Sequence, residues 1–298
     1  MRGSPAFLKT AWIPFVLAPA WGLNWPVIKV LLATVPPFTL RALGLGAAAL
    51  LLGALAVAQR RPLVPPRATW PGIFLSGLFA VVAFNMATAF AQLTTTTSRA
   101  AVLTYTMPMM SAALAWAFLG ERPGQRGAWA LACGGAGLAL LAWPVFSAPS
   151  ASWAGLAYPL LAAAAWAVGT LVTKRAPPVQ DRVVATAWQL ALGGVCGAVA
   201  ALAAGERMAG PWPAVTWGAF TYHVGVAMAL AYVLWYRLLD EMSATVSSLT
   251  TLAVPVVGVL GAMAVVGERP TALDLAGFAG VLAGAALVLV PAQRRSSG

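Results

Sequence analysis

Polar positions divide the chain into long apolar runs. A helix needs about 20 apolar residues to cross a bilayer, and runs of about this length are separated here by short connections rich in proline, glycine and charge. The pattern predicts ten helices, at residues 11–33, 37–58, 70–91, 98–119, 126–146, 152–173, 183–204, 213–236, 244–266 and 273–291. The connections are too short to hold a folded extramembrane domain. The sequence therefore predicts an all-α integral membrane protein.

Two segments that lie 147 positions apart have closely similar sequences. Residues 98–123 end in Gly-Glu-Arg-Pro, and residues 245–270 end in the same four residues. Pro108 and Pro255 occupy equivalent positions inside the two segments. A repeat of this kind indicates that one structural unit has been duplicated.

The duplication has a consequence for membrane topology. The two units, residues 10–146 and 153–291, each contain five predicted helices, and five is an odd number. The second unit therefore enters the membrane from the opposite side, so that the ten transmembrane helices form two inverted five-helix repeats. This arrangement is typical of secondary transporters, because the two halves can exchange conformations and so move access from one side to the other.

Composition supports a membrane protein and narrows its partners. Hydrophobic residues make up 61% of the chain and charged residues 8%, against about 25% charged residues in soluble proteins. The net charge of +11 would suggest nucleic acid in a soluble chain, but the basic residues lie between apolar runs and no stretch joins them to aromatic platforms. The lipid bilayer is the expected partner, and nucleic acid is not. Cys133 and Cys196 lie inside apolar runs and are expected to be packing residues.

The distribution of basic residues predicts the orientation. With the amino terminus inside, 13 of the 18 lysines and arginines fall on the inner side. The positive-inside rule then places both termini in the cytoplasm. We expect the membrane to be a bacterial-type inner (plasma) membrane. The motif at Glu121 and Arg122 is expected inside, and that at Glu268 and Arg269 outside. The first apolar run continues as a full span without a cleavage site, so we do not interpret it as a removable signal.

Short motifs relate the chain to a known family. They are Ala20-Trp21-Gly22, its counterpart Ala165-Trp166-Ala167, and the two Pro…Gly-Glu-Arg-Pro helices. With them the chain resembles the drug/metabolite transporter superfamily in its ten-helix EamA form, over nearly its whole length. Residues 104–108 resemble the Asn-Tyr-Leu-Trp-Pro run of YddG-type exporters of aromatic amino acids, with Thr104 in place of Asn and Met107 in place of Trp. The resemblance implies export of amino acids or similar small metabolites through a central cavity lined by both halves.

Polar residues inside the predicted spans are candidates for the wall of that cavity. Asn24 follows Trp21 by about one helical turn, and Asn85 shares a helix face with Thr88 and Gln92. Such residues normally face the protein interior or a water-filled cavity, because polar groups are costly in lipid. Two interpretations stay open, a substrate-facing wall or hydrogen bonds that hold the helices together.

The eighth predicted helix carries a stripe of larger side chains. Its members are Tyr222, Gly225, Met228, Tyr232 and Trp235, spaced three or four residues apart. Met228 and Tyr232 lie deep enough to face a cavity, whereas Trp235 and Tyr236 are expected in the interfacial aromatic belt. His223, the single histidine, is either a pH-sensitive group or simply a hydrogen-bonding one. The predicted substrate-binding residues are therefore Trp21, Asn24, Asn85, Tyr105, Met107, Trp166, Met228, Tyr232 and His223.

Further features concern helix breaks, helix ends and helix packing. Pro108 and Pro255 remove backbone hydrogen bonds in mid-helix and are predicted hinges. The Gly-Glu-Arg-Pro turns favour helix termination, with a gate formed by pairing of Glu121 with Arg122 and of Glu268 with Arg269 as the second interpretation. Residues 280–284 form a GxxxG match, for a dimer face or, as favoured, for close packing within the bundle.

Absent motifs exclude several activities. All seven acidic residues lie at span ends or in loops, no His/Cys/Asp/Glu cluster for a metal is present, and no phosphate-binding loop for ATP occurs. We therefore expect no metal, cofactor or catalytic residue, and transport that does not depend on a buried acid. The alternatives are an exporter of nucleosides, sugars or amphipathic drugs, or a membrane enzyme acting on lipid-linked substrates. The oligomeric state is left open.

Overall fold

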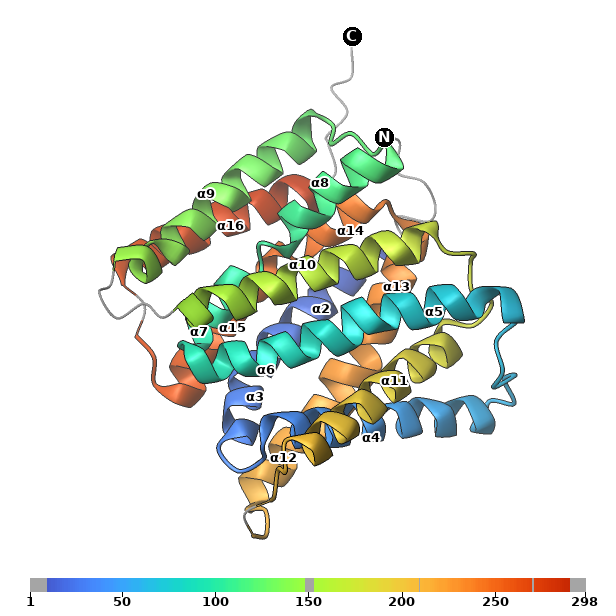
Figure 1. Ribbon diagram of the computed structural model, residues 1–298. Helices are drawn as coiled ribbons and strands as arrows, with labels where there is room; N and C mark the ends of the chain where they lie inside the picture. Colours follow the sequence, from blue (N-terminus) through green and yellow to red (C-terminus); the bar gives the residue numbers. More distant parts are fainter. Residues whose placement is uncertain (1–9, 148–152, 209, 270, 290–298) are drawn as a thin grey trace.

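The fold is a bundle of packed helices (Figure 1). A computed structural model describes residues 10–147, 153–208, 210–269 and 271–289, and no strand occurs in these ranges. The first half consists of α2 (Ile13–Gly22), α3 (Asn24–Leu32), α4 (Pro37–Ala58), η1 (Arg67–Thr69), α5 (Trp70–Gly77), η2 (Leu78–Ala83), α6 (Phe84–Thr94), α7 (Thr97–Thr104), α8 (Met107–Leu119) and α9 (Gln125–Ser147). The second half consists of α10 (Trp153–Arg175), α11 (Arg182–Ala203), α12 (Ala214–Tyr222), η3 (His223–Leu230), α13 (Ala231–Glu241), α14 (Ala244–Thr250), η4 (Thr251–Ala253), α15 (Val254–Val266) and α16 (Ala272–Leu289).

The predicted spans correspond to continuous or nearly continuous helical segments. Within the described ranges, eight segments are long and apolar enough to cross a membrane. The predicted fifth and tenth spans correspond to α9 and α16, which end next to residues outside the described part. The all-α membrane fold is thus confirmed, and the number of ten spans stays a prediction.

Equivalent helices of the two halves pack against each other. The α4 helix lies along α11, and α9 lies along α16 (Figure 1). Glycines allow the backbones to approach, since a Cβ on Gly197 would lie 2.6 Å from the Ala42 nitrogen. A Cβ on Gly280 would similarly lie 3.0 Å from Gly137 Cα, and one on Gly284 would lie 2.8 Å from the Ala130 oxygen. The GxxxG match in α16 is therefore used for packing within the bundle.

The fourth span of each half is broken near its proline. Pro108 lies in the first turn of α8 and Pro255 in the first turn of α15, after interruptions at Tyr105–Thr106 and at η4. We predicted kinks inside continuous helices. The structure instead ends one helix and begins another, which places each proline where its missing N–H leaves no intrahelical bond unmade.

The third span of each half contains a π-helical segment. These are η2 and η3, and residues 78–83 of the first are equivalent to residues 225–230 of the second under the 147-residue offset. The sequence did not predict them. A π segment widens the helix and alters which side chains share a face, and such segments occur often at functional sites.

Each Gly-Glu-Arg-Pro turn caps a helix of the opposite half. Glu121 accepts hydrogen bonds from the Ala244 and Thr245 nitrogens at 3.1 and 3.0 Å, and from the Thr245 hydroxyl at 3.0 Å. Glu268 accepts from the equivalent Thr97 and Ser98 nitrogens at 3.1 and 3.3 Å. The Ser98 hydroxyl also donates to Glu268. Both carboxylates thus satisfy orphan N–H groups at a helix start, where the helix dipole favours negative charge.

These contacts revise the predicted gate pairs and fix the direction of the helices. Among the described residues the ion pairs are Arg61 with Asp181 and Arg182 with Asp240, so neither Glu121 nor Glu268 pairs with its neighbouring arginine. The end of α8 meets the start of α14, and the end of α15 meets the start of α7. The two broken spans therefore run in opposite directions, as inverted repeats require.

Candidate substrate-binding cavity

Two residues at equivalent positions of the repeats touch each other in the middle of the bundle. Asn85 Nδ2 donates to the Tyr232 hydroxyl at 2.8 Å, across a separation of 147 residues. Asn85 Nδ2 also donates to the Val81 oxygen at 2.9 Å, and the Tyr232 hydroxyl donates to the Ala80 oxygen at 3.1 Å. Both carbonyls belong to the π-helical η2. A residue that contacts its own counterpart lies next to the pseudo-twofold axis, so this pair marks the centre of the repeat symmetry.

A cluster of aromatic rings surrounds this pair. Trp21 and Trp166, from the matching tryptophan motifs of α2 and α10, meet edge to face with centroids 5.3 Å apart. Trp235 lies 6.0 Å from Trp21 and 5.2 Å from Trp166. The Trp21 indole also donates to the Ala227 oxygen at 3.1 Å. Trp235 and Tyr236 are each 1% exposed. Our assignment of these two to an interfacial belt was therefore wrong, because both lie in α13 within one turn of Tyr232 and face the interior with it.

A small cavity of about 40 Å³ lies between the aromatic cluster and the polar residues of α3 and α6. It is lined by Trp21, Asn24, Trp25, Ile28, Phe84, Asn85, Thr88, Tyr105, Met107, Trp166, Met228 and Tyr232. Eight of the nine residues predicted to bind substrate are in this set. His223, the ninth, lies behind it and donates from Nδ1 to Asn24 Oδ1 at 2.8 Å. Their role in binding stays a prediction.

Both interpretations of the polar residues on α6 apply, to different residues. Asn85 and Thr88 line the cavity. Gln92, one turn further on, donates to the Trp25 oxygen at 2.7 Å, and its own backbone oxygen accepts from Lys29 Nζ at 2.8 Å. Gln92 therefore ties α3 to α6, while the preceding two turns face the cavity.

Arg41 was missed by the sequence analysis. No motif singled it out, but it lies inside α4 with 0% exposure. Its Nη2 donates to the hydroxyl of Thr88 at 3.3 Å, and Thr88 is a cavity residue. A single arginine near a span end gives no signal of burial in the sequence, because it has the same appearance as a residue that reaches into the headgroup region.

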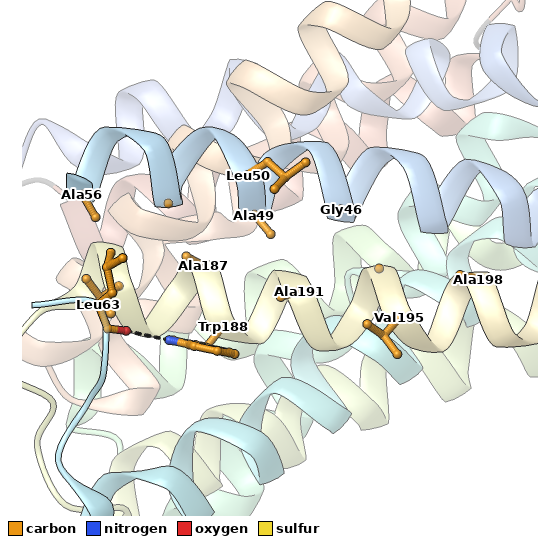
Figure 2. Close-up of a pocket in the computed structure, with 13 residues that line it drawn as sticks. Gly46, Ala49, Leu50, Ala56, Leu63, Ala187, Trp188, Ala191, Val195 and Ala198 are labelled. Carbon is orange, nitrogen blue, oxygen red and sulfur yellow. Dashed lines mark hydrogen bonds between the residues drawn. The ribbon is translucent and has the colours of Figure 1, made fainter. Parts of the chain in front are cut away.

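A larger hollow lies elsewhere in the bundle (Figure 2). It measures about 440 Å³ and lies between α4 and α11, where it is lined by Gly, Ala, Leu, Val and Trp residues. Leu50 and Val195 at its rim are 76% and 62% exposed. The indole N–H of Trp188 donates a hydrogen bond to the Leu63 oxygen at 2.9 Å. The hollow faces outward and has no side chain that would recognise a polar metabolite, so lipid chains are its natural occupant.

Comparison with known proteins identifies the family. The EamA-like transporter family model matches residues 9–143 and again residues 153–290. The chain therefore belongs to the EamA-like transporter family, and it is a multi-pass membrane protein of the transporter class.

Relatives agree with this assignment. An uncharacterized transporter of Bacillus subtilis, YvbV, is 24% identical over 91% of this chain and 88% of its own length. An uncharacterized transporter of Synechocystis is 26% identical over 89% of this chain and 84% of its own. A chloroplastic WAT1-related protein of Arabidopsis thaliana is 31% identical over 59% of this chain, which spans 43% of that relative. A crystal structure with a TM-score of 0.71 at 19% identity covers 94% of this chain and 96% of its own, and shows the same fold.

Proposed function

We propose that the protein is a secondary transporter that exports amino acids, aromatic and other neutral ones over a broad range, by alternating access across a bacterial-type inner membrane. The observation that carries the proposal is the buried cavity at the contact between the two repeats. It combines aromatic walls with a few polar groups, which is the composition of small-molecule sites. Family membership supports transport of a small molecule, and the chemistry of the cavity supports the substrate class.

The residues that line the cavity favour some amino acids over others, but they do not select one amino acid strictly. Trp21 and Trp166 offer ring faces and edges to an apolar side chain, and aromatic contacts contribute roughly 0.5–1.5 kcal/mol beyond the area they bury. Met107 and Met228 complete the wall, and methionine adapts its shape to different ligands. We expect aromatic amino acids to be preferred within a broad range.

The closed cavity implies a conformational change during transport. A water molecule needs roughly 10–15 Å³ of such volume, so a cavity of about 40 Å³ holds only a few waters and no amino acid. The breaks before Pro108 and Pro255 supply positions at which the halves of the fourth and ninth spans can change angle. Glu121 and Glu268 close opposite ends of the bundle, so release of one cap at a time would open one face at a time.

The positions of the acids favour movement down the gradient of the substrate. Glu121, Glu206 and Glu268 are engaged at helix starts, and no carboxylate lines the cavity in the described part of the chain. Proton relays in membranes usually require an embedded acid or histidine, and the embedded His223 lies behind the lining, where its Nδ1 is bonded to Asn24. We therefore expect flux without an obligatory proton.

The test is release of labelled compounds from liposomes that contain the purified protein. Preloaded phenylalanine, leucine and glycine should leave faster than from protein-free liposomes, with phenylalanine fastest, and an imposed pH gradient should not drive accumulation. Chemically unchanged compounds in the medium distinguish transport from an enzyme activity. Release of uridine or glucose without release of any amino acid would replace the proposed substrate class by one of the alternatives.

A further inference from the structure

Arg41 is the only lysine, arginine or carboxylate of the described residues that is fully buried. The single hydrogen bond of its side chain runs from Nη2 to the Thr88 hydroxyl, at 3.3 Å. The Nε and Nη1 groups have no partner. A guanidinium stays charged in proteins, and buried polar groups without partners are rare enough that each calls for an explanation.

No acid of the described chain neutralises this charge. Both ion pairs of the described residues leave Arg41 out. Glu206 approaches the start of the same helix, but its oxygens accept from the Phe38 nitrogen at 3.1 Å, the Thr39 nitrogen at 2.7 Å and the Thr39 hydroxyl at 2.8 Å. Glu206 therefore serves as a helix cap and leaves the guanidinium uncompensated.

Another unpartnered polar atom lies one helical turn from Arg41. His223 packs its ring edge against α4, where a Cβ on Gly44, one turn after Arg41, would lie 2.9 Å from His223 Nε2. This Nε2 has no partner, while Nδ1 is bonded to Asn24. Asn24 and Thr88 both line the cavity. Behind Asn24 and Thr88 the cavity is thus bordered by buried polar groups that lack hydrogen-bond partners, whereas Trp21 and Trp166 form aromatic parts of its wall.

We propose that Arg41 forms an anion subsite that binds the carboxylate of the transported substrate. The inference rests on the proposed transport function and deepens it by naming the charged group that the substrate must carry. Nε and one Nη of a guanidinium form a planar pair of donors that matches the two oxygens of a carboxylate. Thr88 stands between the guanidinium and the closed cavity, so the carboxylate takes the place of its hydroxyl when the cavity opens. The substrate side chain then points to Trp21 and Trp166.

The first test uses the wild-type protein in liposomes or detergent. Labelled L-phenylalanine is competed with unlabelled L-phenylalanine, with phenylalaninamide and with phenethylamine, which keep the ring and the ammonium but lack the carboxylate. We expect the latter two to compete about 30-fold less well or worse, the factor expected when one partner of a buried charge pair is removed. Equal competition by phenylalaninamide would overturn the proposal, whatever the folding of any variant.

Variants then connect this discrimination to Arg41. Arg41→Gln should reduce the preference for phenylalanine over phenylalaninamide to near 1, whereas Arg41→Lys, which keeps the charge without the planar donor pair, should retain part of it. Arg99→Gln, a charge removal at the start of α7, is the matched control and should keep the wild-type ratio.

Arg41→Met should raise the melting temperature of the detergent-solubilised protein, because an apolar side chain replaces an unpaired buried charge. A residue with only a structural role would lower it.

The two levels of inference fail in different ways. If the wild-type protein neither binds nor moves any amino acid, the proposed function is wrong. If it moves phenylalanine, and Arg41→Gln folds and keeps the wild-type ratio of phenylalanine to phenylalaninamide, transport stands and the anion subsite is wrong.

Discussion

The two halves of the protein match in their framework and differ at the cavity. Glu121 and Glu268 make the same three kinds of hydrogen bond to the opposite half, and Pro108 and Pro255 both begin a helix after a break. These caps and breaks occur at both ends of the bundle, so they belong to the framework that the two halves share.

Positions around the cavity have diverged between the halves. The counterpart of Arg41 under the 147-residue offset is Trp188, which is 37% exposed in the outer hollow, whereas Arg41 is 0% exposed. The counterpart of Thr88 is Trp235. The symmetric fold therefore encloses an asymmetric cavity, because a threonine bonded to a buried arginine in one half corresponds to a tryptophan in the other. Under the proposed function, the matched features serve the mechanism and the diverged positions select the substrate.

Labelling from the two sides of the membrane tests the symmetry most directly, because an all-or-none difference is expected. Cys133 and Cys196 are replaced by alanine, and a single cysteine is placed at Arg122 or at Arg269, both exposed at helix ends. A membrane-impermeant reagent should reach the first only from the cytoplasm and the second only from outside. Labelling of both from one side would contradict the inverted topology.

Substitutions of aromatic residues that line the cavity should abolish most transport. Trp166→Ala and Tyr105→Ala should each reduce liposome flux at least ~10-fold, and removal of a buried tryptophan costs about 3–5 kcal/mol of stability. Flux is therefore measured only on monodisperse protein, with Trp166→Phe as the milder variant. Trp188→Ala, which changes the exposed tryptophan at the position equivalent to Arg41, is the control and should keep wild-type flux. Undiminished flux in both cavity variants would require a different site.

The two helix caps should have equal energies and opposite effects on access. Glu121→Gln and Glu268→Gln each weaken hydrogen bonds to a charged acceptor, which contribute about 1.5–3 kcal/mol. The reactivity of a single cysteine at Met107 toward an impermeant reagent added outside should rise in Glu268→Gln and fall in Glu121→Gln. A change of the same sign in both variants would show that the caps stabilise the fold without controlling the two faces.

The smallest effect is expected for the ion pair between Arg61 and Asp181. Their side chains are 36% and 19% exposed, and pairs of this kind contribute about 0–1 kcal/mol. Arg61→Gln should therefore barely change the thermal unfolding temperature in detergent, and high salt should remove the difference. Glu206→Gln, which weakens the cap on α4, should lower that temperature more. The reverse order would mean that the exposed pair is the stronger tie between the halves.

The framework could be predicted from the sequence because it depends on repetition and periodicity. The equivalence of Asn85 and Tyr232 follows from the 147-residue offset, and Trp21 and Trp166 follow from matching motifs. The burial of Arg41 could not be predicted, since it depends on how α4 packs against α6 and η3. The burial of Trp235 also escaped prediction. The stripe placed it on the same face as Tyr232, but periodicity gives the face of a helix and does not tell whether a tryptophan near its end lies in the interior or in the interfacial belt.

The contact between Asn85 and Tyr232 has a consequence for how such a protein could evolve. If the five-helix unit existed as a separate polypeptide that paired with an inverted copy of itself, this position would face its own duplicate, and one codon would set both sides of the contact. Two identical side chains must then satisfy each other. Fusion of the halves into one gene removes that constraint. An amide donor can meet a phenolic acceptor at 2.8 Å, and each side of the site can adapt separately to one end of an asymmetric cargo.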